Sequence, residues 1–241
     1  MWGFRKPKAI TKYTDLQTWD KHGIEVMEEV QLKEEKPVFP VNTEINKKVS
    51  VWFHGDSSAL KCDAVVNAAN SKLAAGGGIC GILHSAAGPE LQVACNKIGY
   101  TETGEAALTP GFKLPAKYVI HAVGPRGEHP EALKKAYNST LKYIDGDKIK
   151  SIGFCCISTG IFGYPIENAT HVALRTCREF LENKENFDNT DRLIFVVFEP
   201  RDCEVYKRLL QVYFPLEKQE EEKKEEEKVE EEKKEEEKVE E

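Results

Sequence analysis

Three consecutive glycines, Gly76, Gly77 and Gly78, form the part of the sequence best suited to hold an anion. They follow an apolar run that ends in an Asn-Ala-Ala-Asn box, residues 67–70, and they precede a stretch with the apolar spacing of a helix. Glycine lets the backbone approach a ligand closely, and the first turn of a helix offers unpaired amides to negative charge. The segment therefore predicts an anion site, although the glycines alone could equally form a flexible turn.

A second loop, Ile157-Ser-Thr-Gly-Ile-Phe-Gly-Tyr-Pro165, also follows an apolar run and precedes a helical pattern. Its amides and hydroxyls can face the first loop, so that two loops grip a diphosphate from both sides. Neither loop contains the lysine of a phosphate-binding loop, and no Gly-x-Gly-x-x-Gly follows a first strand. Nucleoside triphosphate and dinucleotide sites are therefore disfavoured.

Taken together, the Asn-Ala-Ala-Asn box, the glycine triplet and the second loop resemble the macrodomain family, above all its MacroD-type ADP-ribosyl hydrolases. The resemblance continues through residues 114–125 and 191–198 and covers about two thirds of the chain. Residues 151–180 are also similar to the macrodomain of ganglioside-induced differentiation-associated protein 2, a relative thought not to hydrolyse. The resemblance implies a three-layer α/β/α fold with a central mixed sheet over residues 49–214, after an N-terminal extension at 1–48.

The same resemblance implies a role for each site residue. Asp56 would accept a hydrogen bond from the adenine amino group, Phe198 would stack on adenine, and Asn70 would bind the distal ribose and act in catalysis. A surface Asp, a core Phe and a turn-making Asn are the ordinary alternatives. The full set expected to contact ADP-ribose is Asp56, Ser57, Ser58, Ala69, Asn70, Gly76, Gly77, Gly78, Ile79, Cys80, Ser158, Thr159, Gly160, Ile161, Phe162 and Phe198.

Cys80 departs from the MacroD pattern, which has Asp at this position. That Asp is proposed to orient or activate the attacking water, and a thiol is a poorer acceptor with a much higher ordinary pKa. Viral relatives with Ala here still hydrolyse, so catalysis would rest on Asn70 and preorganised amides. Cys80 could instead be a nucleophile activated by His84, four residues later on the same helical face, but such spacing is common in helices.

The elements that must position these loops follow from the apolar pattern. Short runs rich in Val, Ile and Phe at 49–53, 64–67, 118–123, 152–157 and 193–198 predict buried strands. Longer amphipathic stretches at 83–98, 130–144, 167–181 and 203–213 predict helices between them. This alternation predicts a central sheet covered on both faces, with ligands beyond the carboxyl ends of the strands. Scattered aromatics in the extension, including Trp19 and Phe39, are expected to dock on the domain.

Charge is concentrated at the C-terminus. Residues 217–241 contain 15 Glu and 7 Lys, a net charge of −8 against −7 for the whole chain, which leaves the body at about +1. A near-neutral body makes nucleic acid an unexpected partner. The unit Glu-Glu-Glu-Lys-Lys-Glu-Glu-Glu-Lys-Val occurs twice from Glu220, so the tail, residues 215–241, is expected to be helical or disordered and to serve as a solubilising segment or an interaction arm.

Seven cysteines without metal-ligand spacing indicate reduced thiols and predict a cytoplasmic or nuclear protein with no metal and no other cofactor. No apolar run is long enough for a membrane span. The basic start before Asp15 also fits a mitochondrial address. We expect a monomer that binds ADP-ribose and mono-ADP-ribosylated proteins and hydrolyses the linkage to Glu or Asp, with O-acetyl-ADP-ribose as a second substrate. The alternative is a reader that binds ADP-ribose without cleaving it, as Cys80 suggests.

Overall fold

The computed structural model describes residues 9–29 and 36–217. The expected tail from residue 218 onward, and Trp2 and Phe4 of the extension, lie outside the described residues. No helix in the described ranges is long and apolar enough to cross a membrane.

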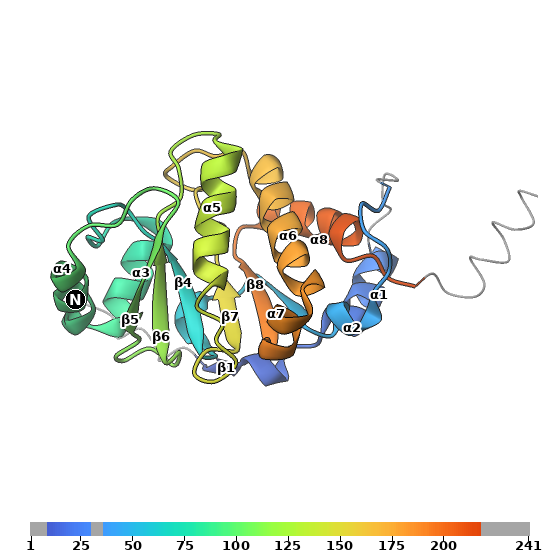
Figure 1. Cartoon of the computed structure of the whole chain (residues 1–241), viewed down its shortest axis with the longest axis horizontal. Coiled ribbons are helices and arrows are strands. Elements are labelled where there is room, and N and C mark those ends of the chain that lie inside the picture. The colour runs from blue at the N-terminus through green and yellow to red at the C-terminus, as the bar shows by residue number, and fades with distance from the viewer. Residues whose placement is uncertain (1–8, 30–35, 218–241) are drawn as a thin grey trace, which may run out of the picture.

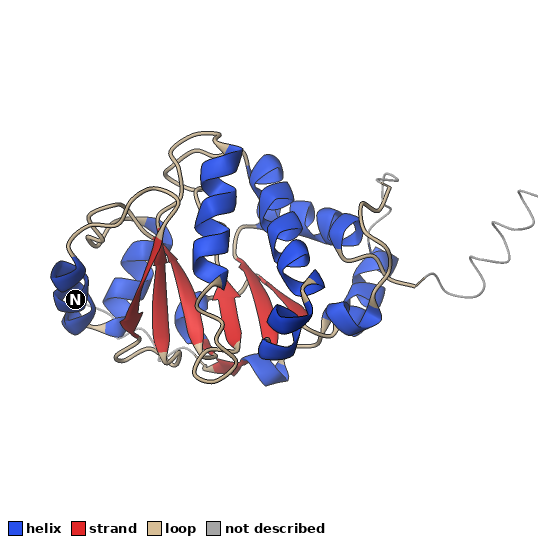
Figure 2. Ribbon diagram, viewed as in Figure 1, coloured by secondary structure: helices blue, strands red, loops and turns tan. Residues whose placement is uncertain are grey.

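A six-stranded mixed sheet forms the centre of the molecule (Figures 1 and 2). Its order is β2 (Val49–Phe53), β8 (Arg192–Val197), β7 (Ser151–Phe154), β4 (Ala64–Ala68), β6 (Tyr118–Ala122) and β5 (Ala106–Pro110). The first five strands are parallel and β5 pairs antiparallel with β6. All five predicted strands are present, because short Val- and Ile-rich runs suit strands that are buried on both faces.

Helices cover both faces of this sheet, as the three-layer expectation requires. On one face, α3 (Gly78–Ala87) and α4 (Pro89–Ile98) pack with Val65 and Ile194. On the other, α5 (Pro130–Leu141), α6 (Ile166–Glu182) and α8 (Pro200–Tyr213) pack with Val66 and Phe195. Successive residues of β4 and β8 therefore serve opposite layers, which is the alternation that a strand imposes. The macrodomain-type fold class predicted from the sequence is confirmed.

The N-terminal extension packs against this body. Trp19, the first residue of α1 (Trp19–Glu29), is fully buried, and its Nε1 donates to the Phe214 carbonyl at 2.8 Å. In the following α2 (Thr43–Asn46), the Asn46 amide donates to the Pro215 carbonyl at 2.9 Å. The prediction that the extension's aromatics dock on the domain is confirmed for Trp19.

Shorter elements complete the chain. A two-stranded parallel ribbon joins β1 (Thr11–Lys12) to β3 (Leu60–Lys61), and single 3₁₀ turns form η1 (Tyr13–Asp15) and η2 (Ser57–Ala59). The short helix α7 (Lys184–Asn189) leads into β8.

Two local predictions were wrong. The helix expected over 83–98 is two helices, because Gly88 adopts φ +89° and Pro89 starts α4 at a position where its missing N–H is harmless. Strand β5 was missed. It lies at the edge of the sheet and Thr109 is its one buried residue, so its sequence lacks a continuous apolar run.

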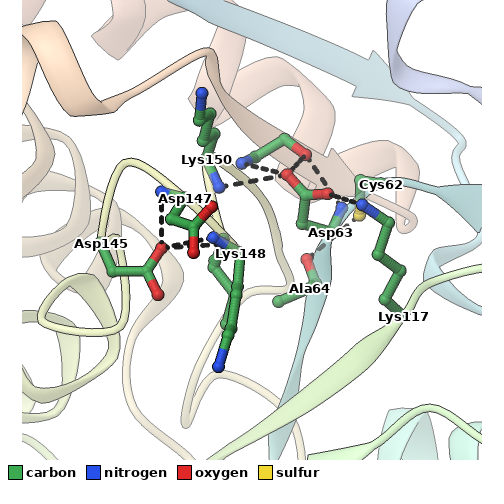
Figure 3. A network of polar contacts seen from close by, with 10 residues as sticks. Cys62, Asp63, Ala64, Lys117, Asp145, Asp147, Lys148 and Lys150 are labelled. Carbon is green, nitrogen blue, oxygen red and sulfur yellow. Dashed lines mark hydrogen bonds and ion pairs between the residues drawn. The ribbon is translucent and has the colours of Figure 1, made fainter.

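Asp63 joins the amino ends of three neighbouring strands (Figure 3). Its carboxylate accepts from Lys117 Nζ at 2.7 Å, before β6, and from the amide and hydroxyl of Ser151, at the start of β7, at 3.0 and 2.8 Å. The Lys150 amide adds a fourth bond at 3.1 Å. Burial alone raises the pKa of Asp63, but the bonds from Lys117, Ser151 and Lys150 outweigh it and hold the pKa below its ordinary value.

Candidate functional site

A cleft of about 620 Å³ lies at the carboxyl ends of the five parallel strands, within the range typical of small-molecule sites. Each strand contributes the segment that follows it. The contributions are Gly55 to Ser57 after β2, Phe198 and Glu199 after β8, Cys155 to Phe162 after β7, Ala69 and Asn70 after β4, and Gly124 and Arg126 after β6. The fold thus gathers residues more than a hundred positions apart into one concave surface.

The glycine loop forms one wall of this cleft. Gly76, Gly77 and Gly78 are exposed, and α3 begins at Gly78 with φ +59°. Within the described residues, no acceptor pairs with the amides of Gly76 and Gly77. The loop lies tightly over its own helix, because a Cβ at Gly81 would come within 2.4 Å of the Gly76 carbonyl oxygen. Glycine is therefore needed at position 81 for packing, and the triplet itself remains open to a ligand.

The second loop, residues 157–163, forms the opposite wall and is held from several sides. Ser158 is buried with φ +69°, a conformation that is uncommon for a residue with a side chain. Its carbonyl accepts from the Tyr164 amide at 3.0 Å, and the Phe162 carbonyl accepts from the Gly127 amide at 2.7 Å. Gly124 makes room for the loop, since a Cβ there would lie 2.1 Å from Ser158 Oγ.

The two loops approach each other across the cleft. A Cβ at Gly77 would stand 2.8 Å from the Cδ1 atom of Ile161, so the glycine triplet and the second loop are in contact range. The amides of Gly160, Ile161 and Phe162 have no hydrogen-bond acceptor among the described residues. Ser158 Oγ is likewise buried and without a partner in that part of the chain. Unpaired donors thus gather on both walls, which suits an anionic ligand.

Asn70 lines the cleft and also shapes the loop before the triplet. Its Oδ1 accepts from the amides of Lys72 at 3.1 Å and Ala74 at 3.2 Å, and its Nδ2 donates to the Ala74 carbonyl at 2.7 Å. The turn-making role, kept as an alternative from the sequence, is therefore present. Since a carboxamide nitrogen carries two hydrogens, one N–H of Asn70 is still available to a ligand.

The region around Asp56 follows β2. The Asp56 carboxylate caps η2 by accepting from the Ser58 amide at 2.9 Å and its hydroxyl at 2.7 Å. Ser57 lines the cleft, whereas Ser58 does not. Ser58 is turned toward Asp56 and supports it. Phe198, just after β8, is 62% exposed, an unusual degree of exposure for a large aromatic ring and one that leaves its face free to stack.

Several cleft residues were not found from the sequence. Arg126 lines the cleft and places its guanidinium 4.4 Å from the centre of the Phe162 ring. Asp202, near the start of α8, is buried and lines the other end, and burial raises its pKa above the ordinary value. Neither belongs to a motif, although both follow strand ends, where the fold class already predicts a ligand site. The remaining additions are Gly55, Ala68, Ile82, Gly124, Cys155, Cys156, Ile157, Glu199 and Arg201.

Cys80 lies in the first turn of α3, 5% exposed, at the floor of the cleft. Its Sγ lies 3.7 Å from the Ala74 carbonyl oxygen and 3.6 Å from the Asn67 amide nitrogen. Burial lowers the pKa of His84, so this imidazole is neutral at pH 7 and brings no positive charge to stabilise a thiolate. The lack of positive charge on His84 therefore disfavours a Cys80 nucleophile activated by this residue.

A family model for the Macro domain matches residues 66–173. Among curated relatives, the ADP-ribose glycohydrolase MACROD2 of Xenopus laevis is 46% identical over 208 residues, covering 82% of this chain and 49% of that protein. The chain thus spans about half the length of this relative.

Two solved structures are also similar. The macro domain of ganglioside induced differentiation associated protein 2 matches with a TM-score of 0.76 and 32% identity, covering 88% of this chain and 100% of the other. The Trypanosoma brucei macrodomain in complex with ADP-ribose matches with a TM-score of 0.70 and 36% identity, over 85% of this chain and 78% of the other.

Proposed function

This chain belongs to the macrodomain family, and from that premise we propose that its cleft binds ADP-ribose and removes mono-ADP-ribose from Glu or Asp side chains of modified proteins. O-acetyl-ADP-ribose is the second substrate in this proposal, because it presents a comparable ester. The relatives support both parts, since one is named an ADP-ribose glycohydrolase and another was solved with ADP-ribose.

The observation that carries the binding half is the pair of loops facing each other with unpaired amides. Gly76 and Gly77 on one wall and Gly160 to Phe162 on the other supply donors from two directions. A diphosphate is an anion with acceptors on both sides, so it satisfies both walls at once. Phe198 offers a ring face on one side of these walls, and Asn70 offers an N–H near the glycine triplet. In this proposal Phe198 stacks on adenine, the two loops hold the diphosphate, and Asn70 binds the distal ribose.

The proposed reaction consumes one water and breaks the ester between the distal-ribose anomeric carbon and a protein carboxylate. Its products are ADP-ribose and the free Glu or Asp. In this chain the preorganised amides would hold the diphosphate and thereby fix the position of the distal ribose, while Asn70 would orient that sugar. Cys80 is assigned no general-base role in this proposal, because it offers a thiol in place of the carboxylate of the MacroD pattern.

Cys80 also supports a second candidate function, an ADP-ribose reader that does not hydrolyse. The thiol stands where the MacroD pattern has a carboxylate, and its Sγ lies 3.7 Å from the Ala74 carbonyl oxygen. In this version the same loops bind ADP-ribose, but no group promotes attack on the ester. Binding is common to both candidates, and turnover distinguishes them.

The deciding experiment uses a protein labelled with Glu-linked mono-ADP-ribose. The full chain is incubated with it, label release is followed, and ADP-ribose binding is measured by calorimetry with ADP and ATP as comparisons. Release of free ADP-ribose supports the hydrolase. Retention of the label together with specific binding supports the reader, and equal heats with all three nucleotides contradict both.

Two variants test the assigned roles. Asn70→Asp keeps an oxygen for the Lys72 and Ala74 amides but loses both N–H groups, including the bond to the Ala74 carbonyl, so we expect turnover to fall at least tenfold. Unchanged turnover would remove Asn70 from catalysis. Cys80→Asp restores the missing carboxylate, and a gain in turnover would show that its absence limits the rate.

A further inference from the structure

A cluster of three metal-binding side chains lies beneath the glycine loop, outside the contacts used for ADP-ribose. It consists of His84 from α3, Cys95 from α4 and His121 from β6, whose ligand atoms all lie within 4.8 Å of one another. Cys95 and His121 have no exposed surface and His84 is 8% exposed. We propose that these three residues form a binding site for Zn²⁺ that ties both helices of this layer to the sheet.

The donor set and its spacing fit this ion. Two imidazoles and one thiol, with no carboxylate among them, match the nitrogen and sulfur ligands that Zn²⁺ selects over Mg²⁺ or Ca²⁺. Cys95 Sγ lies 3.6 Å from His121 Nε2. Zinc bonds of about 2.3 Å to sulfur and 2.0 Å to nitrogen at a tetrahedral angle place these two atoms about 3.5 Å apart. The pair therefore already spans one edge of a zinc tetrahedron.

One buried atom of the cluster and one beside it lack partners in the described residues. His84 Nε2 has no hydrogen bond within the described residues, and its ring centre lies 6.2 Å from that of His121. Burying a ring nitrogen without a hydrogen-bond partner is unfavourable. A metal ion between the two rings would use this lone pair. Three protein ligands then leave one position of the tetrahedron for a further ligand.

Asn67 is the second residue with an unsatisfied atom, and it can set the tautomer of His121. Its Oδ1 is buried without a partner in the described chain, while its Nδ2 lies 3.1 Å from His121 Nδ1. A half-turn of the amide would bring Oδ1 to that place, where it can accept from Nδ1–H. His121 Nε2 would then present its lone pair to the metal in place of its present contact with Thr109 Oγ1, at 2.9 Å. Metal-binding histidines are usually held by such an acceptor.

Zinc binds the neutral ring of histidine and the ionised thiolate of cysteine. Burial, with a smaller contribution from His84, lowers the pKa of His121 to about 4, and burial also lowers the pKa of His84. Burial, with a smaller contribution from the nearby Cys80, raises the pKa of Cys95 to about 11. The metal-free thiol therefore carries a proton that Zn²⁺ must displace, and one proton is released for each ion bound.

The test is a titration of the reduced, chelator-treated full chain with Co²⁺, followed by displacement with Zn²⁺. We expect one equivalent of Co²⁺ to produce a thiolate-to-cobalt absorption band with tetrahedral visible bands, and one equivalent of Zn²⁺ to remove them. Cys95→Ala should abolish the thiolate band, and His84→Ala should weaken Zn²⁺ binding at least tenfold. The matched control is Cys177→Ala, a fully buried cysteine in α6 on the other face of the sheet, which should bind as the parent does.

Thermal unfolding with and without Zn²⁺ provides a second test. Zn²⁺ should raise the Tm of the parent and of Cys177→Ala but not that of Cys95→Ala or His84→Gln. The glutamates of the tail can bind cations weakly, but they cannot produce a thiolate band. Absence of the band in the parent, or an equal band in Cys95→Ala, would overturn the proposal. Neither result bears on ADP-ribose binding, so the two proposals fail independently.

Discussion

At the amino ends of β4, β6 and β7, the Asp63 carboxylate accepts four hydrogen bonds and joins the three strands (Figure 3). At the carboxyl ends of the same strands, Ser158 Oγ is buried without a partner in the described chain, and loop amides of Gly160 to Phe162 remain unpaired. The polar groups around Asp63 are paired within the chain, whereas these groups of the second loop lack partners in the described residues. The Asp63 network contributes to stability, and the unpaired donors of the second loop remain available to a ligand.

Removing the Asp63 carboxylate should cause the largest change, a loss of stability. Asp63→Ala leaves the Ser151 and Lys150 amides and the Ser151 hydroxyl without their acceptor, so we expect the free energy of unfolding to fall by about 3 kcal/mol. Urea denaturation measures it. ADP-ribose binding by the remaining folded protein should be unchanged. The control is Lys117→Ala, whose side chain is 67% exposed and should contribute less than about 1 kcal/mol.

Adding a methyl group beside the second loop should reduce both ADP-ribose binding and stability. A methyl at Gly124 would lie 2.1 Å from Ser158 Oγ and 2.6 Å from Ile157 Cγ2, so Gly124→Ala should displace the second loop. We expect a loss of about 1–3 kcal/mol of stability and a rise in the Kd for ADP-ribose of at least tenfold. Gly160→Ala is the control for stability, because its Cβ would meet no atom within 4 Å. Equal binding by Gly124→Ala and the parent would show that the second wall does not contact the ligand.

Phe198→Ala should separate the two properties most cleanly. The ring is 62% exposed, so its loss should change the free energy of unfolding by less than about 0.5 kcal/mol. Loss of stacking on adenine should weaken ADP-ribose binding by about 1–3 kcal/mol in calorimetry. Tyr100→Ala removes a ring that is 65% exposed outside the cleft and should leave binding unchanged. If both variants bind alike, Phe198 is not the adenine platform.

The smallest expected effect is the pH dependence of the contribution that Asp63 makes to stability. The pKa of Asp63 is lower in the folded protein than in the unfolded chain, so between these values the unfolded state binds more protons and stability rises with pH. The contribution of Asp63 is therefore complete above about pH 4 and is lost as pH falls through the folded pKa. The difference in unfolding free energy between the parent and Asp63→Ala should shrink from pH 5 to pH 2.5. A constant difference would contradict the charged role.

Local patterns predicted most of the elements and the two loops, and the resemblance to macrodomains implied the individual contact residues. Apolar runs located β2, β4, β6, β7 and β8, because strands buried on both faces leave a continuous signal. The glycine triplet and the second strand-to-helix loop identified both walls, since a backbone that approaches a ligand closely restricts the residue type at each position. Every predicted contact residue except Ser58 lines the cleft. Edge strand β5 and the break at Gly88 carried weaker signals, because half-exposed strands and glycine-proline pairs are common in loops as well.

The sequence by itself determined which segments can approach an anion, because those requirements are local to a few consecutive residues. Only the tertiary structure decided that Arg126 and Asp202 join the cleft and that His84, Cys95 and His121 meet beneath it. These residues come from different elements and share no spacing in the chain. Their distances depend on how helices pack on the sheet, and that packing is the sum of many contacts distributed over the whole domain.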